Sequence, residues 1–165
     1  APEVRAAHTV AAYVGIGTEP GTLPLLDRLR SAGVRVLLPV LCPDRDLDWA
    51  GYAGAGALAV AARGLREPEG PRLGREAVRE ADVVVVPALA VDHRGVRLGR
   101  GGGSYDRVLA RVPPGRPVVA LLYAGEVLAR LPADPHDRPV NAAATPEGWL
   151  RLPLPGPTGV AQCPA

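Results

Sequence analysis

Val83–Arg107 reads VVVVPALAVDHRGVRLGRGGGSYDR, in which a run of valines leads through a glycine-rich segment into a helix-forming segment. Four consecutive valines followed by proline predict a strand buried on both faces, Val83–Pro87, as found in parallel sheets. The glycines around Gly101 predict a loop, and Ser104–Arg111 is the predicted helix after it, with Ser104 as a good N-cap. A strand, a loop and a helix in this order are typical of an α/β sheet.

The rest of the chain alternates between similar segments. We predict further strands at Thr9–Gly15, Val34–Leu41, Pro117–Leu122 and Pro139–Ala144, and helices between Thr22 and Gly33, at Leu73–Ala81 and at Gly125–Arg130. Residues 47–63 are rich in Ala and Gly and predict no particular element. The alternation predicts an α/β fold, specifically a three-layer α/β/α domain with a mainly parallel sheet. We assign residues 1–152 to one such domain and expect residues 153–165, rich in Pro and Gly, to form a loose tail.

The composition argues against several classes of protein. The formal net charge is +2 and no block of like charge occurs, so we expect no nucleic-acid partner. No apolar run approaches the roughly 20 residues of a membrane span, and no signal-peptide pattern is present. With Cys42 and Cys163 as its two cysteines, the chain fits a reducing cytoplasm. It contains no lysine, which excludes a Schiff-base or P-loop lysine. It contains no methionine either, so we expect that it does not begin where its gene begins.

The glycine-rich segment has the chemistry of a phosphate-binding loop. Glycines let backbone N–H groups approach an anion closely, and the N-terminus of the following helix adds unpaired donors. Arg97 and Arg100 can pair with phosphate oxygens, and Asp106 in the first helical turn can bind a magnesium ion on the same phosphates. The alternative is a flexible surface loop with solvated arginines, in which Asp106 only favours the start of the helix.

Four segments, in order along the chain, resemble the motifs of the 5-formyltetrahydrofolate cyclo-ligase family. Residues 87–107, PALAVDHRGVRLGRGGGSYDR, resemble the family's ATP-binding loop. The others are AYVGIGTEPGT (Ala12–Thr22), GLREP (Gly64–Pro68) and LPADPHDRPVNAAAT (Leu131–Thr145). The resemblance implies an enzyme that uses Mg-ATP to convert 5-formyltetrahydrofolate into 5,10-methenyltetrahydrofolate, ADP and phosphate. It implies ATP and Mg²⁺ as cofactors and the folate as substrate, and we expect a cytoplasmic monomer.

The resemblance also assigns roles to individual residues. The residues implied to bind ATP are Arg97, Leu98, Gly99, Arg100, Gly101, Gly102, Gly103, Ser104 and Tyr105. The implied catalytic residues are Arg100, which would stabilise the transferred phosphate, and Tyr105. The implied folate contacts are Val14, Glu19, Arg100 and Ser104. The implied magnesium ligands are Asp106 and Asp137.

Three departures from the family pattern leave alternatives open. Ser104 stands where the family commonly has the first of two tyrosines, and Glu126 stands where it often has glutamine. The basic N-terminal helix of the family has no counterpart in this chain. A nucleotide- or folate-binding relative without catalysis therefore remains an alternative. A sugar-phosphate or CoA-handling enzyme on a similar scaffold is a second one, but it would leave the aspartates at both metal positions unexplained.

Overall fold

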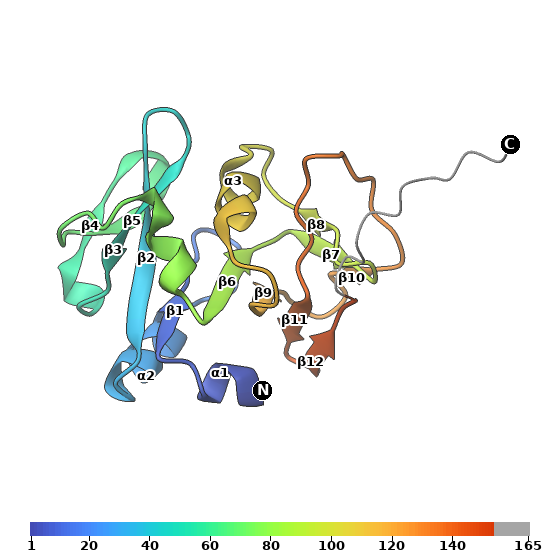
Figure 1. Ribbon diagram of the computed structural model, residues 1–165, viewed down its shortest axis with the longest axis horizontal. Helices are drawn as coiled ribbons and strands as arrows, with labels where there is room; N and C mark the ends of the chain where they lie inside the picture. Colours follow the sequence, from blue (N-terminus) through green and yellow to red (C-terminus); the bar gives the residue numbers. More distant parts are fainter. Residues whose placement is uncertain (154–165) are drawn as a thin grey trace, which may run out of the picture.

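The structure, a computed structural model, describes residues 1–153, and a seven-stranded sheet runs through its centre (Figure 1). The strand order is β12-β11-β9-β6-β1-β2-β3. All neighbouring pairs from β11 to β2 are parallel, whereas the edge strands β12 and β3 are antiparallel to their neighbours. The strands are β1 (Thr9–Ala11), β2 (Arg35–Leu41), β3 (Leu47–Gly51), β6 (Val83–Pro87), β9 (Val118–Leu121), β11 (Ala142–Thr145) and β12 (Gly148–Arg151).

Helices cover both faces of this sheet. On one face lies α2 (Leu23–Ser31), which contacts β2; on the other, α3 (Ser104–Arg111) lies beside the 3-10 helix η3 (Arg75–Glu80). Successive valines of β6 point to opposite faces, so that Val83 packs into the core with α2 and Val84 into the core with α3 and η3. The predicted three-layer α/β/α architecture with a mainly parallel sheet is therefore confirmed. A further short helix, α1 (Pro2–Arg5), precedes β1.

Most of the predicted strands and helices are present, and the clearest ones are confirmed to the residue. β6 and α3 have the bounds that the valine run and the residues after the glycines predict. The segment that begins with β1 was predicted as a strand over residues 9–15, but its ladder ends at Ala11. Gly33 ends α2 with a positive φ of 80°, as expected of a glycine after a helix.

Two predicted helices differ from the structure. Leu73–Ala81 forms the 3-10 helix η3 over six residues only, preceded by Gly74 with φ 93°. The helix predicted at Gly125–Arg130 is wrong: Val127–Leu128 is a short strand, β10, and the Glu126 carbonyl accepts a hydrogen bond from the Val91 N–H. This segment is too short to form a stable helix by itself, and pairing with a neighbouring strand satisfies its backbone instead.

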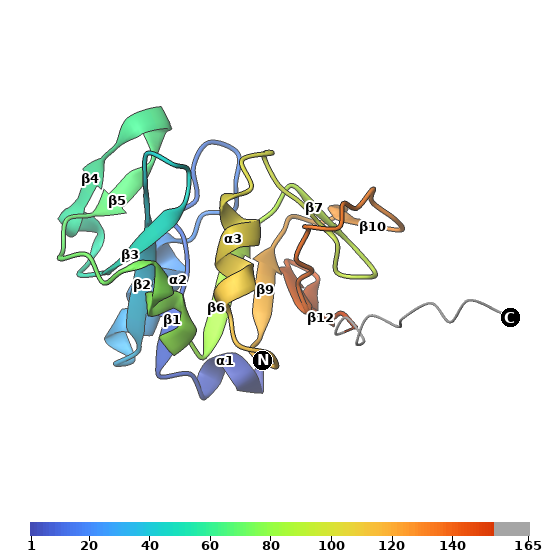
Figure 2. The same ribbon diagram turned by 45° about the horizontal axis from the view of Figure 1, so that its top comes forward.

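Two smaller sheets extend the fold beyond the carboxyl ends of the parallel strands (Figure 2). One is a hairpin of β4 (Leu58–Val60) and β5 (Arg66–Pro68), formed within and after the segment that predicted no element. The other contains β7 (Ala90–Asp92), β8 (Arg97–Leu98) and β10. The 3-10 turns η1 (Ala55–Ala57) and η2 (Ala62–Gly64) flank β4. In both ribbon views these two sheets lie on opposite sides of the central strands.

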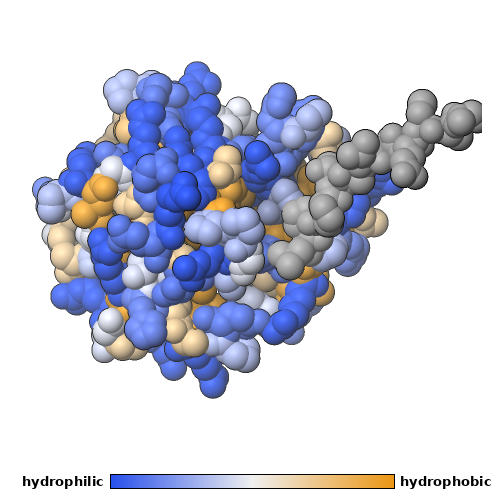
Figure 3. Space-filling view, viewed as in Figure 1, coloured by the Kyte–Doolittle hydropathy of each residue, from blue (hydrophilic) through white to orange (hydrophobic). Residues whose placement is uncertain are grey.

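Among residues 1–153, no helix is long and apolar enough to span a bilayer. On the face shown in Figure 3, the described residues are mostly hydrophilic and the hydrophobic ones form small separate patches. Cys42 is a free, half-buried thiol in the described part of the chain. Cys163 and the predicted tail of residues 153–165, except for Pro153, lie outside the described residues.

Candidate active site

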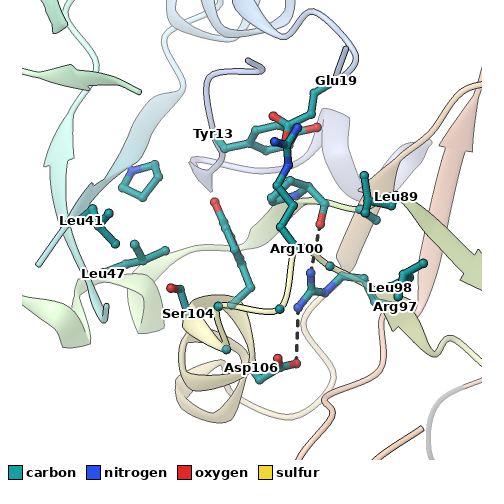
Figure 4. Close-up of a pocket in the computed structure, with 18 of the residues that line it drawn as sticks. Tyr13, Glu19, Leu41, Leu47, Leu89, Arg97, Leu98, Arg100, Ser104 and Asp106 are labelled. Carbon is teal, nitrogen blue, oxygen red and sulfur yellow. Dashed lines mark hydrogen bonds and ion pairs between the residues drawn. The ribbon is translucent and has the colours of Figure 1, made fainter. Parts of the chain in front are cut away.

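A cavity of about 590 Å³ lies beyond the carboxyl ends of β1 and β6, between the two small sheets. This is where open α/β sheets bind their ligands. Every site residue predicted from the sequence lines this one cavity (Figure 4). They are Val14, Glu19, Arg97, Leu98, Gly99, Arg100, Gly101, Gly102, Gly103, Ser104, Tyr105, Asp106 and Asp137. Residues almost 125 positions apart in the sequence are thus brought to one surface.

The loop after β1 holds Glu19 in place through its own backbone. The Gly15 N–H donates to the Thr22 hydroxyl at 2.9 Å, and the Ile16 N–H donates to Glu19 Oε2 at 3.0 Å. Gly15 is required here because a Cβ at this position would lie 2.3 Å from the Pro20 carbonyl oxygen. Thr22 is the N-cap residue of α2, but its hydroxyl makes no capping hydrogen bond and accepts the Gly15 N–H instead. The turn therefore fixes the direction in which Glu19 enters the cavity.

The glycine-rich loop leaves backbone exposed to the cavity. Gly101 and Gly103 have φ of 80° and 68°, a region that other residues rarely adopt, and nothing lies within 4 Å of a Cβ placed on Gly101. The prediction that Ser104 caps α3 is wrong, because Gly103 is the N-cap residue and Ser104 is the first helical residue. Its hydroxyl donates instead to the Arg45 carbonyl at 2.6 Å, and Arg107 Nη2 donates to the same oxygen at 2.9 Å.

Arg97 and Arg100 have different environments. The Arg97 side chain is only 6% exposed; it donates to the Pro87 carbonyl at 3.2 Å and to Asp106 Oδ1 at 3.4 Å, and it lies over the Tyr105 ring. Arg100 is 55% exposed, and its Nε lies 3.1 Å from Glu19 Oε1. Arg97 therefore forms part of the cavity wall, whereas Arg100 is the more exposed arginine and pairs with a largely buried Glu19.

Asp106 and Asp137 are brought to the same end of the cavity. The Arg138 N–H donates to Asp106 Oδ1 at 3.3 Å, so the segment that carries Asp137 touches the first turn of α3. Asp137 Oδ2 accepts the Asp134 N–H at 2.8 Å. Among residues 1–153, no cluster of three or more His, Cys, Asp or Glu side chains is arranged to hold a metal by itself. Two carboxylates completed by phosphate oxygens and water are instead the usual ligand set for magnesium.

Asp92 is a buried carboxylate that stabilises the chain segments at this end of the cavity. Its fully buried carboxylate accepts hydrogen bonds from the Leu131 N–H, the Arg94 N–H and guanidinium, and the Val96 N–H. Burial acts to raise the pKa of Asp92, but these bonds outweigh it and lower the pKa to about 2. Asp92 thereby ties the loop between β7 and β8 to Leu131, at the start of the segment that carries Asp137.

Asp46 is a second buried carboxylate, and it stabilises α3, the helix that follows the glycine-rich loop. Arg111 of α3 donates to both oxygens of Asp46 at 2.9 and 2.6 Å, and Arg75 adds a contact at 3.1 Å. The hydrogen bonds from Arg111 outweigh burial and lower the pKa of Asp46 to about 2. Asp46 follows Arg45, whose carbonyl binds Ser104 and Arg107. The turn before β3 is thus joined to both ends of α3.

Several residues of the cavity were not predicted from the sequence. Tyr13 is 3% exposed and lines the cavity, and its buried hydroxyl has no hydrogen-bond partner in the described part of the chain. Glu67, which belongs to the GLREP segment, also lines the cavity and accepts the Leu41 N–H at 2.9 Å. Further wall residues come from the β4–β5 hairpin and its neighbours: Pro39, Leu41, Leu47, Arg63, Leu65 and Arg66. The sequence did contain a signal for this residue, because Tyr13 carries a hydroxyl near the end of the mostly apolar strand predicted over residues 9–15.

The two tryptophans are packing residues rather than ligand contacts. Trp49 is fully buried in the core beneath α3, and Trp149 packs against the core beneath α2. Within residues 1–153, neither of them lines the cavity. This agrees with packing as the commoner role of a single tryptophan in such segments.

The fold and the cavity define an α/β protein with a cavity beyond the carboxyl ends of a parallel sheet, beside a glycine-rich loop. The chain belongs to the 5-formyltetrahydrofolate cyclo-ligase family, whose model matches residues 1–146. It is 47% identical over 145 residues to a 5-formyltetrahydrofolate cyclo-ligase of Mycolicibacterium smegmatis, covering 85% of this chain and 74% of that protein. It is 34% identical over 152 residues to the Escherichia coli K12 cyclo-ligase, covering 88% of this chain and 81% of that protein.

Solved structures agree with this assignment. The structure of 5,10-methenyltetrahydrofolate synthetase from Aquifex aeolicus matches with a TM-score of 0.76 and 34% identity, covering 92% of this chain and 75% of that chain. The synthetase from Mycoplasma pneumoniae matches with a TM-score of 0.63 and 20% identity, over 84% of this chain and 73% of that chain. The second match supports the fold alone.

Proposed function

We propose that this protein catalyses the ATP-dependent cyclisation of 5-formyltetrahydrofolate to 5,10-methenyltetrahydrofolate, with release of ADP and phosphate. One observation carries the proposal: in a chain of this family, the glycine-rich loop, Glu19 and both predicted metal-binding aspartates line a single cavity. Its volume of about 590 Å³ falls within the range of small-molecule sites. The family supports the catalytic function over the non-catalytic relative.

The reaction consists of activation followed by ring closure. The formamide carbon of the substrate is a poor electrophile, so its oxygen first attacks the γ-phosphorus of ATP and ADP leaves. The resulting carbon has iminium character and is attacked by N10 of the folate. The C–O bond then breaks, phosphate leaves with its electron pair, and N10 loses its proton. No covalent bond to the protein is needed, so the enzyme contributes positioning and charge stabilisation.

The side chains around the cavity are arranged in a way that suits the binding of ATP on one side and of folate on the other. The backbone of the glycine-rich loop and the N-terminus of α3 face the cavity and suit the ATP phosphates. Val14 and Glu19 lie on the loop after β1 and suit the folate. Arg100 belongs to the glycine-rich loop and extends to the loop after β1, where its Nε lies 3.1 Å from Glu19 Oε1. A positive charge held between the two substrates would stabilise the phosphoryl group during its transfer.

Asp106 and Asp137 fit the role of magnesium ligands. Both carry carboxylate oxygens at the end of the cavity nearest the start of α3. A magnesium ion bound there would neutralise charge on the ATP phosphates. Asp106 also accepts a hydrogen bond from Arg97, which keeps its carboxylate oriented in the free protein.

The test is product formation by the purified protein. Mg-ATP and 5-formyltetrahydrofolate are supplied, and the absorbance of the methenyl product is followed with and without magnesium. Growth of the product signal that depends on both magnesium and ATP supports the proposal. Binding of ATP and folate without product would instead favour the non-catalytic relative, and binding of neither would contradict both functions. That the protein works as a monomer in the cytoplasm remains a prediction, which gel filtration and cell fractionation can test.

A further inference from the structure

Tyr13 carries a buried hydroxyl group that the protein leaves without a partner. The residue is 3% exposed, and its oxygen has no hydrogen-bond partner among residues 1–153. It lies two residues beyond β1, at the carboxyl end of the strand, where its side chain lines the cavity. A buried hydroxyl without a partner is costly. Within residues 1–153, Glu3, Trp49, Arg97 and Trp149 also carry a buried side-chain atom without a partner, but of these only Arg97 lines the cavity, and its guanidinium has other partners.

Other tyrosines of the chain show how such a group is normally satisfied. The Tyr52 hydroxyl donates to Asp27 at 2.6 Å, and the Tyr123 hydroxyl donates to the Glu19 carbonyl at 3.3 Å. Tyr13 lies close to Glu19, and Figure 4 shows its ring beside the Glu19 carboxylate. Burial raises the pKa of the Tyr13 hydroxyl, and the negative charge of Glu19 raises it further. The hydroxyl therefore stays protonated and can both donate and accept a hydrogen bond.

We propose that the Tyr13 hydroxyl, which is covered in the free protein, binds the folate substrate directly, next to Glu19, when the Glu19–Arg100 ion pair opens, and contributes to selecting it. This inference rests on the proposed function. An ionised carboxylate can only accept hydrogen bonds, whereas a phenol can also donate one. Together Glu19 and Tyr13 match a heterocycle that presents N–H groups and a carbonyl oxygen along one edge, as the pterin ring does. A substrate that satisfies the Tyr13 hydroxyl removes a cost that the free protein bears, so the contact favours the correct ligand.

The choice of folate over nucleotide follows from the position of Tyr13. It is the chain neighbour of Val14 and lies on the same strand extension that leads to Glu19. In Figure 4, Tyr13 and Glu19 lie together on one side of the cavity and Ser104 and Asp106 on the other, with Arg100 between them. The Tyr13 hydroxyl is therefore at the side opposite the start of α3, where the phosphates are expected.

The test is the Tyr13→Phe variant, which removes the hydroxyl and keeps the ring. We expect the dissociation constant of 5-formyltetrahydrofolate, measured by tyrosine and tryptophan fluorescence or calorimetry, to rise about three- to tenfold. The ATP dissociation constant should stay within about twofold. The melting temperature without ligand should equal or exceed that of the wild type, because an unpaired buried group has been removed. Tyr52→Phe is the matched control: it removes a paired hydroxyl that lies outside the cavity lining, and should lower stability while leaving folate binding unchanged.

The outcomes separate this inference from the proposed function. A wild type that forms product while Tyr13→Phe keeps its folate affinity overturns the role of Tyr13 alone. A variant that loses ATP affinity instead places the hydroxyl at the nucleotide and also overturns the inference. A lowered melting temperature without a change in folate affinity identifies a structural group. A wild type that binds no folate overturns the proposed function and this inference together.

Discussion

Asp46→Asn should strongly lower the free energy of unfolding, because it removes a buried negative charge that is paired with two arginines. The Asp46 side chain is 4% exposed and receives two hydrogen bonds from Arg111 and one from Arg75. Its pKa falls from 3.8 to about 2 on folding, which at about 1.4 kcal/mol per pKa unit corresponds to about 2 kcal/mol of stability at neutral pH. The amide also turns a donor toward the arginines, so we expect a loss of about 2–4 kcal/mol.

The pH dependence gives this prediction a second observable. Because the folded pKa of Asp46 lies below the unfolded value, the carboxylate contributes its full stabilisation above about pH 5. The contribution declines as pH falls through 3.8 toward 2, where both states take up the proton. The difference in unfolding free energy between wild type and Asp46→Asn should therefore be constant from pH 5 to 7. It should then narrow below pH 5.

Urea unfolding at several pH values, followed by circular dichroism, measures this difference. Glu80→Gln is the control, since Glu80 forms a similarly short pair with Arg35 at 2.6 Å but both side chains are about half exposed. That change should cost less than about 1 kcal/mol. A loss below about 1 kcal/mol for Asp46→Asn at pH 7 would refute the reasoning. So would a difference that stays constant down to pH 3.

Three further substitutions test the cavity. Arg100→Ala should lower kcat about 100- to 1000-fold while the folate KM changes less than about threefold, because the charge acts on the transferred phosphate; steady-state kinetics with a comparable kcat would contradict this role. Gly15→Ala should lower the melting temperature and folate affinity, since its Cβ would lie 2.3 Å from the Pro20 carbonyl oxygen, whereas Gly21→Ala has open space and should change neither. Ser104→Ala removes the bond to the Arg45 carbonyl and should raise the ATP KM about three- to tenfold; an unchanged ATP KM would show that this bond does not position the loop.

The strands and helices that local patterns predict well are those with a single dominant signal. Val83–Pro87 and Ser104–Arg111 have the predicted bounds because four valines favour a buried strand and the glycines before Ser104 end any preceding element. Gly125–Arg130 carried no such signal, and pairing with β7 decided its structure. The antiparallel edge strands β3 and β12 were missed for the same reason: each depends on a neighbour strand rather than on its own residues.

The candidate site divides in a similar way. The motifs that resemble the family identified residues from Val14 to Asp137, and the structure places all of them around one cavity. What each residue contacts could not be read from the motifs. Ser104 was predicted to cap a helix, but its hydroxyl binds the Arg45 carbonyl. Arg97 and Arg100 look alike in the sequence, yet one is buried on Asp106 and the other is exposed beside Glu19.

The sequence by itself determined the fold class, the glycine-rich loop and the family, because these depend on local residue patterns and on motifs in a fixed order. Only the tertiary structure decided which polar groups are satisfied. Asp46 and Asp92 are stabilised by partners that come from other strands and helices, whereas the Tyr13 hydroxyl is left without one. Hydrogen bonding and burial depend on distances between residues far apart in the chain, and these distances exist only once the sheet has formed.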